Sequence, residues 1–326
     1  MENVIDIHAH YFPPAYLQFL AEQGLTGILA PARASPRHVP APLPTKIPRI
    51  GKEHLDQRFM AMTQAGVGQQ VLSPPTAPYL SDEAASVKGA RMINDNYATL
   101  AAESDGRLAF WATLPLPHVE ASLQELARGL DELGAVGATM QCFCQNETIV
   151  RAEFEPLFAA LEERRSVLFL HPCQNGLCSH LINEWGLTVC AGATMEDSIV
   201  AMHLIAAQIP SRYPNLRIIV PHLGGILPML LSRLDGQMPR AADAELPSVS
   251  ARRLYYDTVG WGSNPALVAA CMAFGDTQLV PGSDWPFLLE WESYTQTFDH
   301  IRHASLSKAS VDRILYGNAP KLLYGH

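Results

Sequence analysis

The first ten residues hold the feature that most constrains the fold of this chain. An apolar, β-branched run that starts at Val4 ends in two histidines, His8 and His10, separated by one residue. Side chains alternate between the two faces of a strand, so both imidazoles point the same way and can bind one metal ion. A polar pair at a strand edge is the alternative for the pair taken alone. Because the run has the composition of a strand covered on both faces and Pro13 follows it, we favour a buried strand with a functional end.

Strand-like and helix-like segments alternate along the rest of the chain. Further strands are expected at residues 69–72, 108–114, 137–142, 167–172, 216–222, 254–259 and 278–284. Helices are expected at residues 16–24, 53–65, 82–103, 119–133, 154–164, 194–208 and 265–273. Eight strands that alternate with helices in 326 residues predict a parallel (β/α)8 TIM barrel, as a single domain over residues 1–326.

A proline-rich stretch, residues 25–52, interrupts this alternation after the first strand. It contains Pro31, Pro36, Pro40, Pro42, Pro44 and Pro48. So many prolines prevent a regular helix and favour an extended excursion. At the mouth of a barrel we expect this insertion to act as a lid or a dimer contact, and a disordered linker is the alternative.

Polar side chains end four of the eight expected strands. His171 ends the fifth, His222 the sixth and Asp284 the eighth, and they join His8 and His10 of the first. Functional residues of TIM barrels lie at these carboxyl ends, so the five side chains should converge. Four of them suit one divalent metal ion: three imidazoles and a carboxylate favour Zn²⁺, with Mn²⁺, Co²⁺ or Fe²⁺ as alternatives, and leave a position for water or substrate. The remaining histidine is then free for acid–base work.

Charge and composition exclude several classes of partner. The formal net charge is -9 and lysines and arginines form no cluster, which argues against nucleic acid and anionic membranes. The first residues lack the basic and apolar regions of a secretory signal, and no uninterrupted apolar run approaches the length of a membrane span. Six cysteines without a CxxC pair are expected to be reduced thiols. We therefore expect a cytoplasmic enzyme that acts on a small molecule.

The strand-end residues belong to motifs that resemble those of a known family. The motifs are Asp6-x-His8-x-His10 with Pro13 after it, His171-Pro172, His222-x-Gly224-Gly225 and Gly282-Ser283-Asp284-Trp285-Pro286-Phe287. In this order, across nearly the whole chain, they resemble the amidohydrolase superfamily. Within it they are similar to the decarboxylase branch of the amidohydrolase-2 type, which includes aminocarboxymuconate-semialdehyde decarboxylase and 6-methylsalicylate decarboxylase.

The resemblance implies roles for the five side chains. It makes His8, His10, His171 and Asp284 the ligands of one Zn²⁺ per subunit, and His222 the base that activates a water held by the metal. Binuclear hydrolases of the superfamily carry a carbamylated lysine at the end of the fourth strand. None of the five lysines of this chain lies there, so a mononuclear site is expected.

The resemblance also implies residues that bind the substrate. Arg233 corresponds in spacing to an arginine that binds the substrate carboxylate and reaches into the site of a neighbouring subunit, which implies a homodimer. Trp185 and Phe287 match aromatic residues of the pocket. Arg49 is the nearest candidate for a second family arginine in the loop after the first strand.

The activity implied is non-oxidative decarboxylation of an aromatic acid, such as a hydroxybenzoate or salicylate, or of a dienoic acid. A proton must reach the carbon that bears the carboxylate, either relayed through His222 and the metal-held water or delivered by Asp284. A metal-dependent hydrolase that acts on an amide, a lactone or a ring-cleavage product is the alternative enzyme. A barrel in which the metal has only a structural role is the alternative outside enzymology.

Overall fold

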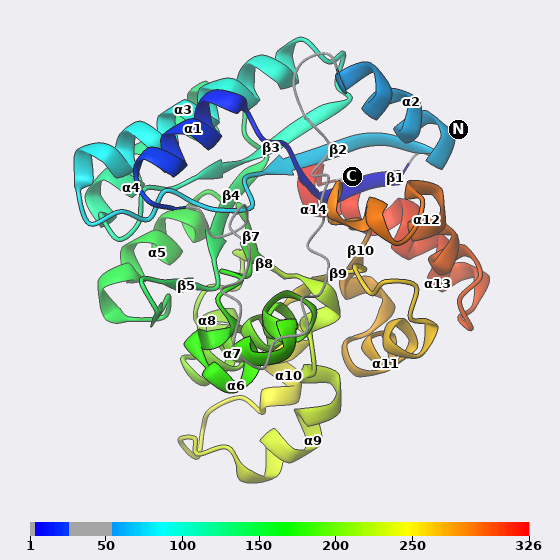
Figure 1. The fold of residues 1–326 in the computed structure, drawn as a ribbon. Helices are drawn as coiled ribbons and strands as arrows, with labels where there is room; N and C mark the ends of the chain where they lie inside the picture. Colours follow the sequence, from blue (N-terminus) through cyan, green and yellow to red (C-terminus); the bar gives the residue numbers. More distant parts are fainter. Residues whose placement is uncertain (1–3, 26–53, 326) are drawn as a thin grey trace.

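The structure, a computed structural model, describes residues 4–25 and 54–325 and has eight parallel strands in the wall of a barrel (Figure 1). The strand order is β1-β2-β3-β4-β7-β8-β9-β10. The bounds are β1 (Val4–His10), β2 (Val67–Ser73), β3 (Leu108–Thr113), β4 (Gly137–Gln141), β7 (Val167–His171), β8 (Arg217–Val220), β9 (Tyr255–Asp257) and β10 (Leu279–Val280). The segment after β10 closes the ring against β1, because the backbone N–H of Asp284 donates to the carbonyl of His8 at 2.8 Å. The predicted TIM barrel is confirmed.

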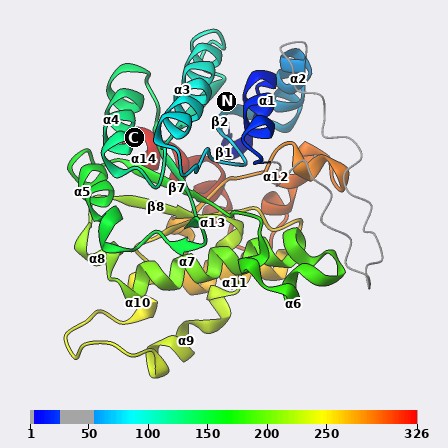
Figure 2. The same ribbon diagram turned by 60° about the vertical axis from the view of Figure 1, so that its left-hand side comes forward.

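Helices surround the strands, and α3, α4 and α5 stand side by side in the turned view (Figure 2). The longer ones are α1 (Pro14–Glu22), α2 (Leu55–Ala65), α3 (Glu83–Ala102), α4 (Val119–Ala127), α5 (Glu155–Glu163), α7 (Thr194–Ala206), α9 (Leu227–Gln237), α11 (Asn264–Phe274), α12 (Tyr294–Arg302) and α14 (Asn318–Tyr324). Shorter ones are α6 (His180–Asn183), α8 (Ile209–Arg212), α10 (Pro247–Ala251) and α13 (Lys308–Asp312), and a hairpin comprises β5 (Phe143–Cys144) and β6 (Glu147–Thr148). The predicted insertion at residues 25–52 lies outside the described residues, apart from Leu25.

The half of the barrel interior farther from the carboxyl ends of the strands, the lower half, is an apolar core. Its buried members come from six strands and from α14: Ile7, Val71, Ala109, Trp111, Val167, Phe169, Ile219, Val280, Ala319 and Leu322. The rings of Trp111 and Phe169 stack at 5.7 Å between centroids. The polar upper half of the barrel, at the carboxyl ends of the strands, packs directly on this apolar layer.

The first strand departs from regular pairing just below its histidines. Its register with β2 shifts between Asp6 and Ala9. As a result, Ile7 packs in the interior core while the ring of His8 also lies inside, 4.9 Å from that of Phe169. The indole N–H of Trp111 donates to the carbonyl of Ile7 at 3.0 Å and stabilises the irregular backbone.

Two expected strands are shorter than the sequence pattern indicated. Residues 216–222 and 278–284 were expected to be extended, but β8 ends at Val220 and β10 at Val280. A proline follows each strand and cannot donate to the ladder. His222 and Asp284 then adopt left-handed conformations, with φ of 52° and 61°. Both side chains therefore project from tight turns just beyond the strand ends.

One segment has the length and hydropathy of a membrane span. Residues 188–206 form a 19-residue segment, and an 18-residue window within it has a mean hydropathy of 1.3. Half of this segment is buried against the rest of the protein, and it contains the fully buried carboxylates Glu196 and Asp197. Since these carboxylates hydrogen-bond to barrel loops, the segment is a core helix of the barrel.

Candidate metal centre and acid–base site

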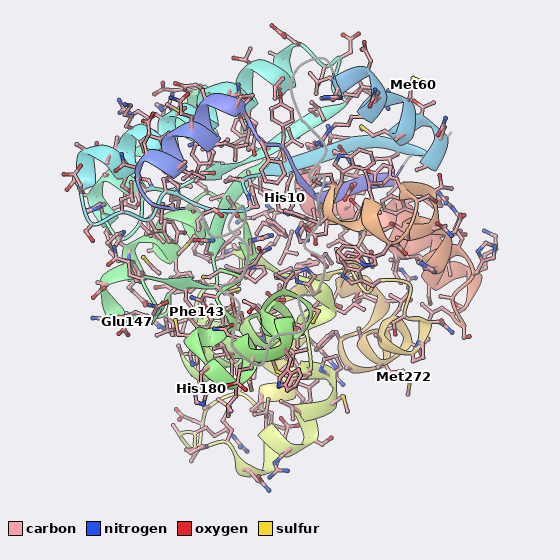
Figure 3. All side chains as sticks on the ribbon, viewed as in Figure 1. His10, Met60, Phe143, Glu147, His180 and Met272 are labelled. Carbon is pink, nitrogen blue, oxygen red and sulfur yellow. The ribbon has the colours of Figure 1, made fainter. Side chains whose placement is uncertain are left out.

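Four side chains from three separate parts of the chain meet at the mouth of the barrel. The ligand atoms of His8, His10, His171 and Asp284 lie within 4.8 Å of one another, and all four residues are buried. Nε2 of His10 is 3.2 Å from Nε2 of His8 and 3.0 Å from Oδ1 of Asp284. Figure 3 shows His10 near the centre of the ring of strands. Within the described residues this is the one group of side chains spaced to bind a metal ion.

The hydrogen bonds of the three rings define which nitrogen faces the centre. Nδ1 of His8 bonds Oδ2 of Asp257 at 2.7 Å, while Nδ1 of His10 and of His171 bond the carbonyls of Ser73 and Pro172, each at 3.0 Å. A carbonyl accepts and cannot donate, so Nδ1 of these two rings carries the proton and Nε2 has a free lone pair. Such outer partners are typical of metal-binding histidines.

This donor set fits a divalent cation. Converging imidazole lone pairs and a carboxylate repel one another unless positive charge lies between them. Ligands about 2.1 Å from one ion are roughly 3 to 3.5 Å apart, which agrees with the spacings at His8, His10 and Asp284. Three nitrogens and one oxygen are a ligand set of zinc and related metals.

Three of the four ligands have protonation states that suit this assignment. Burial lowers the pKa of His10 and His171, so both rings are neutral near pH 7. Burial alone would raise the pKa of Asp284, but hydrogen bonds from His10, His222 and His8 outweigh it and hold the pKa well below its usual range. Neutral imidazoles and an ionised carboxylate are the forms that bind a metal. For His8, burial acts to lower the pKa, but the charge and hydrogen bond of Asp257 outweigh it and raise the pKa to about 9, so this ring must release a proton when a cation binds.

His222 lies beside the four ligands without joining them. Its Nδ1 bonds Oδ2 of Asp197 at 2.7 Å, and its Nε2 is 4.0 Å from Oδ2 of Asp284. Burial acts to lower the pKa of His222, but the charge and hydrogen bond of Asp197 outweigh it and hold the pKa well above its ordinary value. The ring can therefore carry a proton at Nε2 that faces the metal centre.

The backbone around His222 is strained into a left-handed turn. His222, Leu223, Gly224 and Gly225 all have positive φ, between 52° and 72°. A Cβ at Gly225 would collide with the backbone of Thr194, which explains the glycine. Non-glycine residues in this region cost about 1 to 3 kcal/mol each and occur where surrounding contacts hold them. The strain therefore coincides with the residue predicted to do acid–base work.

The predicted substrate-binding residues have different surroundings. The ring of Phe287 lies 5.5 Å from that of His10 and 5.8 Å from that of Phe12, so it borders the metal centre. Trp185 is 58% exposed in the turn after α6. Arg233 is exposed on α9, where its Nε donates to Gln237. Arg49 lies outside the described residues. Contacts of these four residues with a substrate remain predictions.

Three carboxylates around the histidines were not predicted as site residues. Asp257, at the end of β9, bonds His8 through Oδ2 and accepts the backbone N–H of His222 through Oδ1. Glu196 and Asp197 lie on α7. An aspartate inside an expected strand, two residues before its end, and an acidic pair inside an apolar helix were the available signals.

A further polar residue faces the centre from β4. Ala138 and Met140 pack outside the barrel, so strand alternation directs Gln141 inward, and Gln141 pairs with His171 in the sheet. Its side chain is 9% exposed and forms no hydrogen bond within the described residues. This is the end of the fourth strand, where no lysine was expected. Gln141 offers an amide to a molecule bound at the mouth.

Comparison with known proteins agrees with this arrangement. A family model described as amidohydrolase matches residues 5–324. A gamma-resorcylate decarboxylase of Polaromonas sp. is 28% identical over 288 residues, which cover 82% of this chain and 86% of that protein. A 6-methylsalicylic acid decarboxylase of Penicillium expansum is 29% identical over 296 residues, 86% of this chain and 84% of that protein.

Solved structures share the fold. A crystal structure of 5-carboxyvanillate decarboxylase from Sphingomonas paucimobilis has a TM-score of 0.82 at 21% identity and covers 99% of each chain. A dihydroxybenzoic acid decarboxylase from Polaromonas sp. JS666, with bound manganese and the inhibitor 2-nitroresorcinol, has a TM-score of 0.79 at 22% identity. It covers 99% of this chain and 97% of that one.

Proposed function

Because the chain belongs to the amidohydrolase family, we propose that it is a metal-dependent decarboxylase that releases carbon dioxide from a hydroxybenzoate-type acid. The observation that carries the proposal is the convergence of three imidazoles and one carboxylate beside a separate, protonatable His222. The relatives named as decarboxylases of gamma-resorcylate and 6-methylsalicylic acid support the substrate class. A dienoic acid is the second candidate substrate.

The metal would be held by His8, His10, His171 and Asp284, as one ion per subunit. We propose Zn²⁺, since three nitrogen ligands favour it, and Mn²⁺ is the alternative supported by the manganese in a structural neighbour. When bound, the cation supplies positive charge that holds oxygen atoms of the substrate and stabilises developing negative charge.

His222 and Asp284 are the residues that move the proton. Decarboxylation needs a proton on the ring carbon that bears the carboxylate, because the electrons of the breaking C–C bond must return to the ring. His222 holds a proton at Nε2, and Asp284 lies 4.0 Å away, so the pair can deliver it from either member. The C–C bond then breaks, carbon dioxide leaves, and solvent restores the proton. The balance is one carboxylate and one proton in, one arene and one carbon dioxide out.

Other residues would bind and orient the acid. Phe287 and Phe12 present ring edges beside His10 that suit a flat aromatic substrate. Gln141 can hydrogen-bond a hydroxyl or carboxylate oxygen. Arg233 is exposed on its own chain, so a role in the substrate site requires a second copy, in a homodimer. Trp185 and Arg49 are proposed to border the same pocket.

Metal analysis combined with a screen for carbon dioxide release tests the proposal. Substituted salicylates and dihydroxybenzoates should release carbon dioxide in step with loss of the acid and appearance of the matching phenol. A hydrolase would instead incorporate oxygen from labelled water into its product and release no carbon dioxide. That result, with amides or lactones as substrates, would overturn the decarboxylase in favour of the alternative.

Removing the metal separates a catalytic from a structural role. Chelation should abolish carbon dioxide release, and restoring Zn²⁺ or Mn²⁺ to the stripped protein should recover it. Thermal stability is measured on the same samples. If metal restores stability while no acid in the screen is decarboxylated, the cation has only a structural role, and the proposal is wrong.

A further inference from the structure

One turn of α7 contacts the loops that follow two different site strands. Three consecutive polar residues, Glu196, Asp197 and Ser198, lie in this otherwise apolar helix, and each is at most 1% exposed. Consecutive helical residues project about 100° apart, so three neighbours can reach three different partners. Buried carboxylates are costly unless they are hydrogen-bonded, and here each has specific partners.

Glu196 holds the loop that follows β7 by its backbone. Its two carboxylate oxygens accept the N–H groups of four consecutive residues at 2.5 to 3.1 Å, namely Cys173, Gln174, Asn175 and Gly176. The N–H of Cys173 belongs to the same peptide unit as the carbonyl of Pro172, which accepts from Nδ1 of His171. One rigid peptide plane therefore lies between Glu196 and the metal-binding ring of His171.

Asp197 and Ser198 hold the turn that follows β8. Oδ2 of Asp197 accepts from Nδ1 of His222 at 2.7 Å, and its Oδ1 accepts from the thiol of Cys142 at 3.5 Å. The hydroxyl of Ser198 accepts the N–H of Ile226 at 2.9 Å. The left-handed turn between His222 and Ile226 is thus fixed at both ends by neighbouring residues of one helix.

We propose that α7 is the positioning element of the site, in which Glu196 orients the metal ligand His171 and Asp197 orients the acid–base residue His222. The two residues are adjacent on a rigid helix, so the spacing between the metal centre and the proton donor is determined by one element instead of two independent loops. The proposal depends on the proposed function only for its kinetic measurements.

Substitutions of Glu196 and Asp197 should have different effects on metal affinity and on turnover. In Glu196→Gln an amide NH₂ replaces one of two oxygens that each accept two N–H groups, so the loop that begins with the peptide beside His171 loses half of its anchor. The dissociation constant for Zn²⁺ should rise about 10- to 100-fold, with kcat recovered at saturating metal. Asp197→Asn should leave that constant unchanged and lower kcat by about tenfold or more. A residue that only stabilised the fold would not separate metal affinity from turnover.

A double-mutant cycle tests whether Asp197 acts through His222. Asp197→Asn should cost about tenfold or more in the wild-type background and almost nothing in a His222→Asn background, because the oriented ring is already absent. Equal losses in both backgrounds would overturn the role of Asp197. Asp197→Glu, which keeps the charge but displaces it by one methylene, is the second variant and should give an intermediate kcat.

Ring-nitrogen spectra provide a measurement that does not require turnover. The protein is labelled with ¹⁵N-histidine and loaded with Zn²⁺, and the signals of His222 and His171 are assigned by substitution. Asp197→Asn should shift the ring nitrogens of His222 only, and Glu196→Gln those of His171 only. If neither variant shifts its own histidine, α7 does not position the rings.

A matched control is Glu125→Gln. Glu125 is also a buried carboxylate on a helix, but its partners are Arg91, Asn94 and Arg128 in the outer layer. It should lower stability without changing zinc affinity, kcat or the ring spectra. Absence of carbon dioxide release from every acid would overturn the proposed function and leave the zinc and spectral tests of α7 intact.

Discussion

The two halves of the barrel interior use the same strands for opposite purposes. On β7, Phe169 packs in the apolar lower half, and His171, two residues later, is a candidate metal ligand. Two residues of a strand span about 6.6 Å, so the apolar layer and the layer of candidate metal ligands are adjacent. The lower half is apolar, whereas the upper half holds buried charge and left-handed turns at His222 and Asp284. Stability and reactivity can therefore be altered separately.

The largest effect is expected at the metal centre. Asp284→Asn removes a candidate metal ligand that is also a proposed partner in proton transfer, so carbon dioxide release should fall by about 10³-fold or more. The melting temperature should change little, because the lower half is intact. Activity and bound metal are measured on the same preparation. Activity within tenfold of wild type would contradict the assignment of Asp284.

A truncation in the lower half should show the opposite pattern. Ile219 is fully buried in the interior core, so Ile219→Ala should cost about 2 to 5 kcal/mol of unfolding free energy. Chemical denaturation gives this value, and kcat per folded molecule should stay within about threefold of wild type. A large fall in kcat would mean that the two halves are not separable.

His222→Asn tests the upper half without removing a metal ligand. Losing the protonatable ring should cost about 10²-fold or more in kcat, while bound metal stays at the wild-type level. Unfolding free energy should change by less than for Ile219→Ala, since the amide NH₂ of Asn can still donate a hydrogen bond to Asp197. Near-wild-type turnover would remove His222 from the mechanism.

The smallest effect is expected for a conservative substitution in the lower half, which tests more finely whether the two halves are independent. Ile219→Val deletes one methylene from the same core position and should cost about 0.5 to 1.5 kcal/mol. Metal affinity and kcat should be indistinguishable from wild type. A change in metal affinity or in kcat would mean that packing changes in the apolar lower half alter the geometry of the metal centre. The two halves would then be less independent than the geometry indicates.

Much of the fold could be predicted because the relevant signals are local. The helix expected at residues 82–103 is α3 (Glu83–Ala102), and the first strand has the predicted bounds. The ends of β8 and β10 were harder, since prolines shorten both strands and turn the backbone before His222 and Asp284. The insertion at 25–52 and Arg49 lie outside the described residues and stay predictions.

The carboxylate partners of His8 and His222 could not be predicted, because they depend on contacts between distant residues. Asp257 bonds His8 across 249 positions of sequence, and Asp197 bonds His222 across 25. Contacts between residues so far apart in sequence produce no periodic pattern of apolar residues that would reveal them. The composition of α7 is also that of an ordinary apolar helix. Only its acidic pair, Glu196 and Asp197, hinted at a further role.

By itself the sequence determined the alternation of strands and helices and the identity of the four converging side chains, because side-chain periodicity and strand-end position are local properties. The tertiary structure alone decided which nitrogen of His8, His10 and His222 faces the centre, since that choice depends on acceptors contributed by other strands and by α7. The metal centre at the mouth of this barrel thus depends on two things. The sequence supplies the side chains at the strand ends, and folding supplies the hydrogen-bond partners that orient their rings.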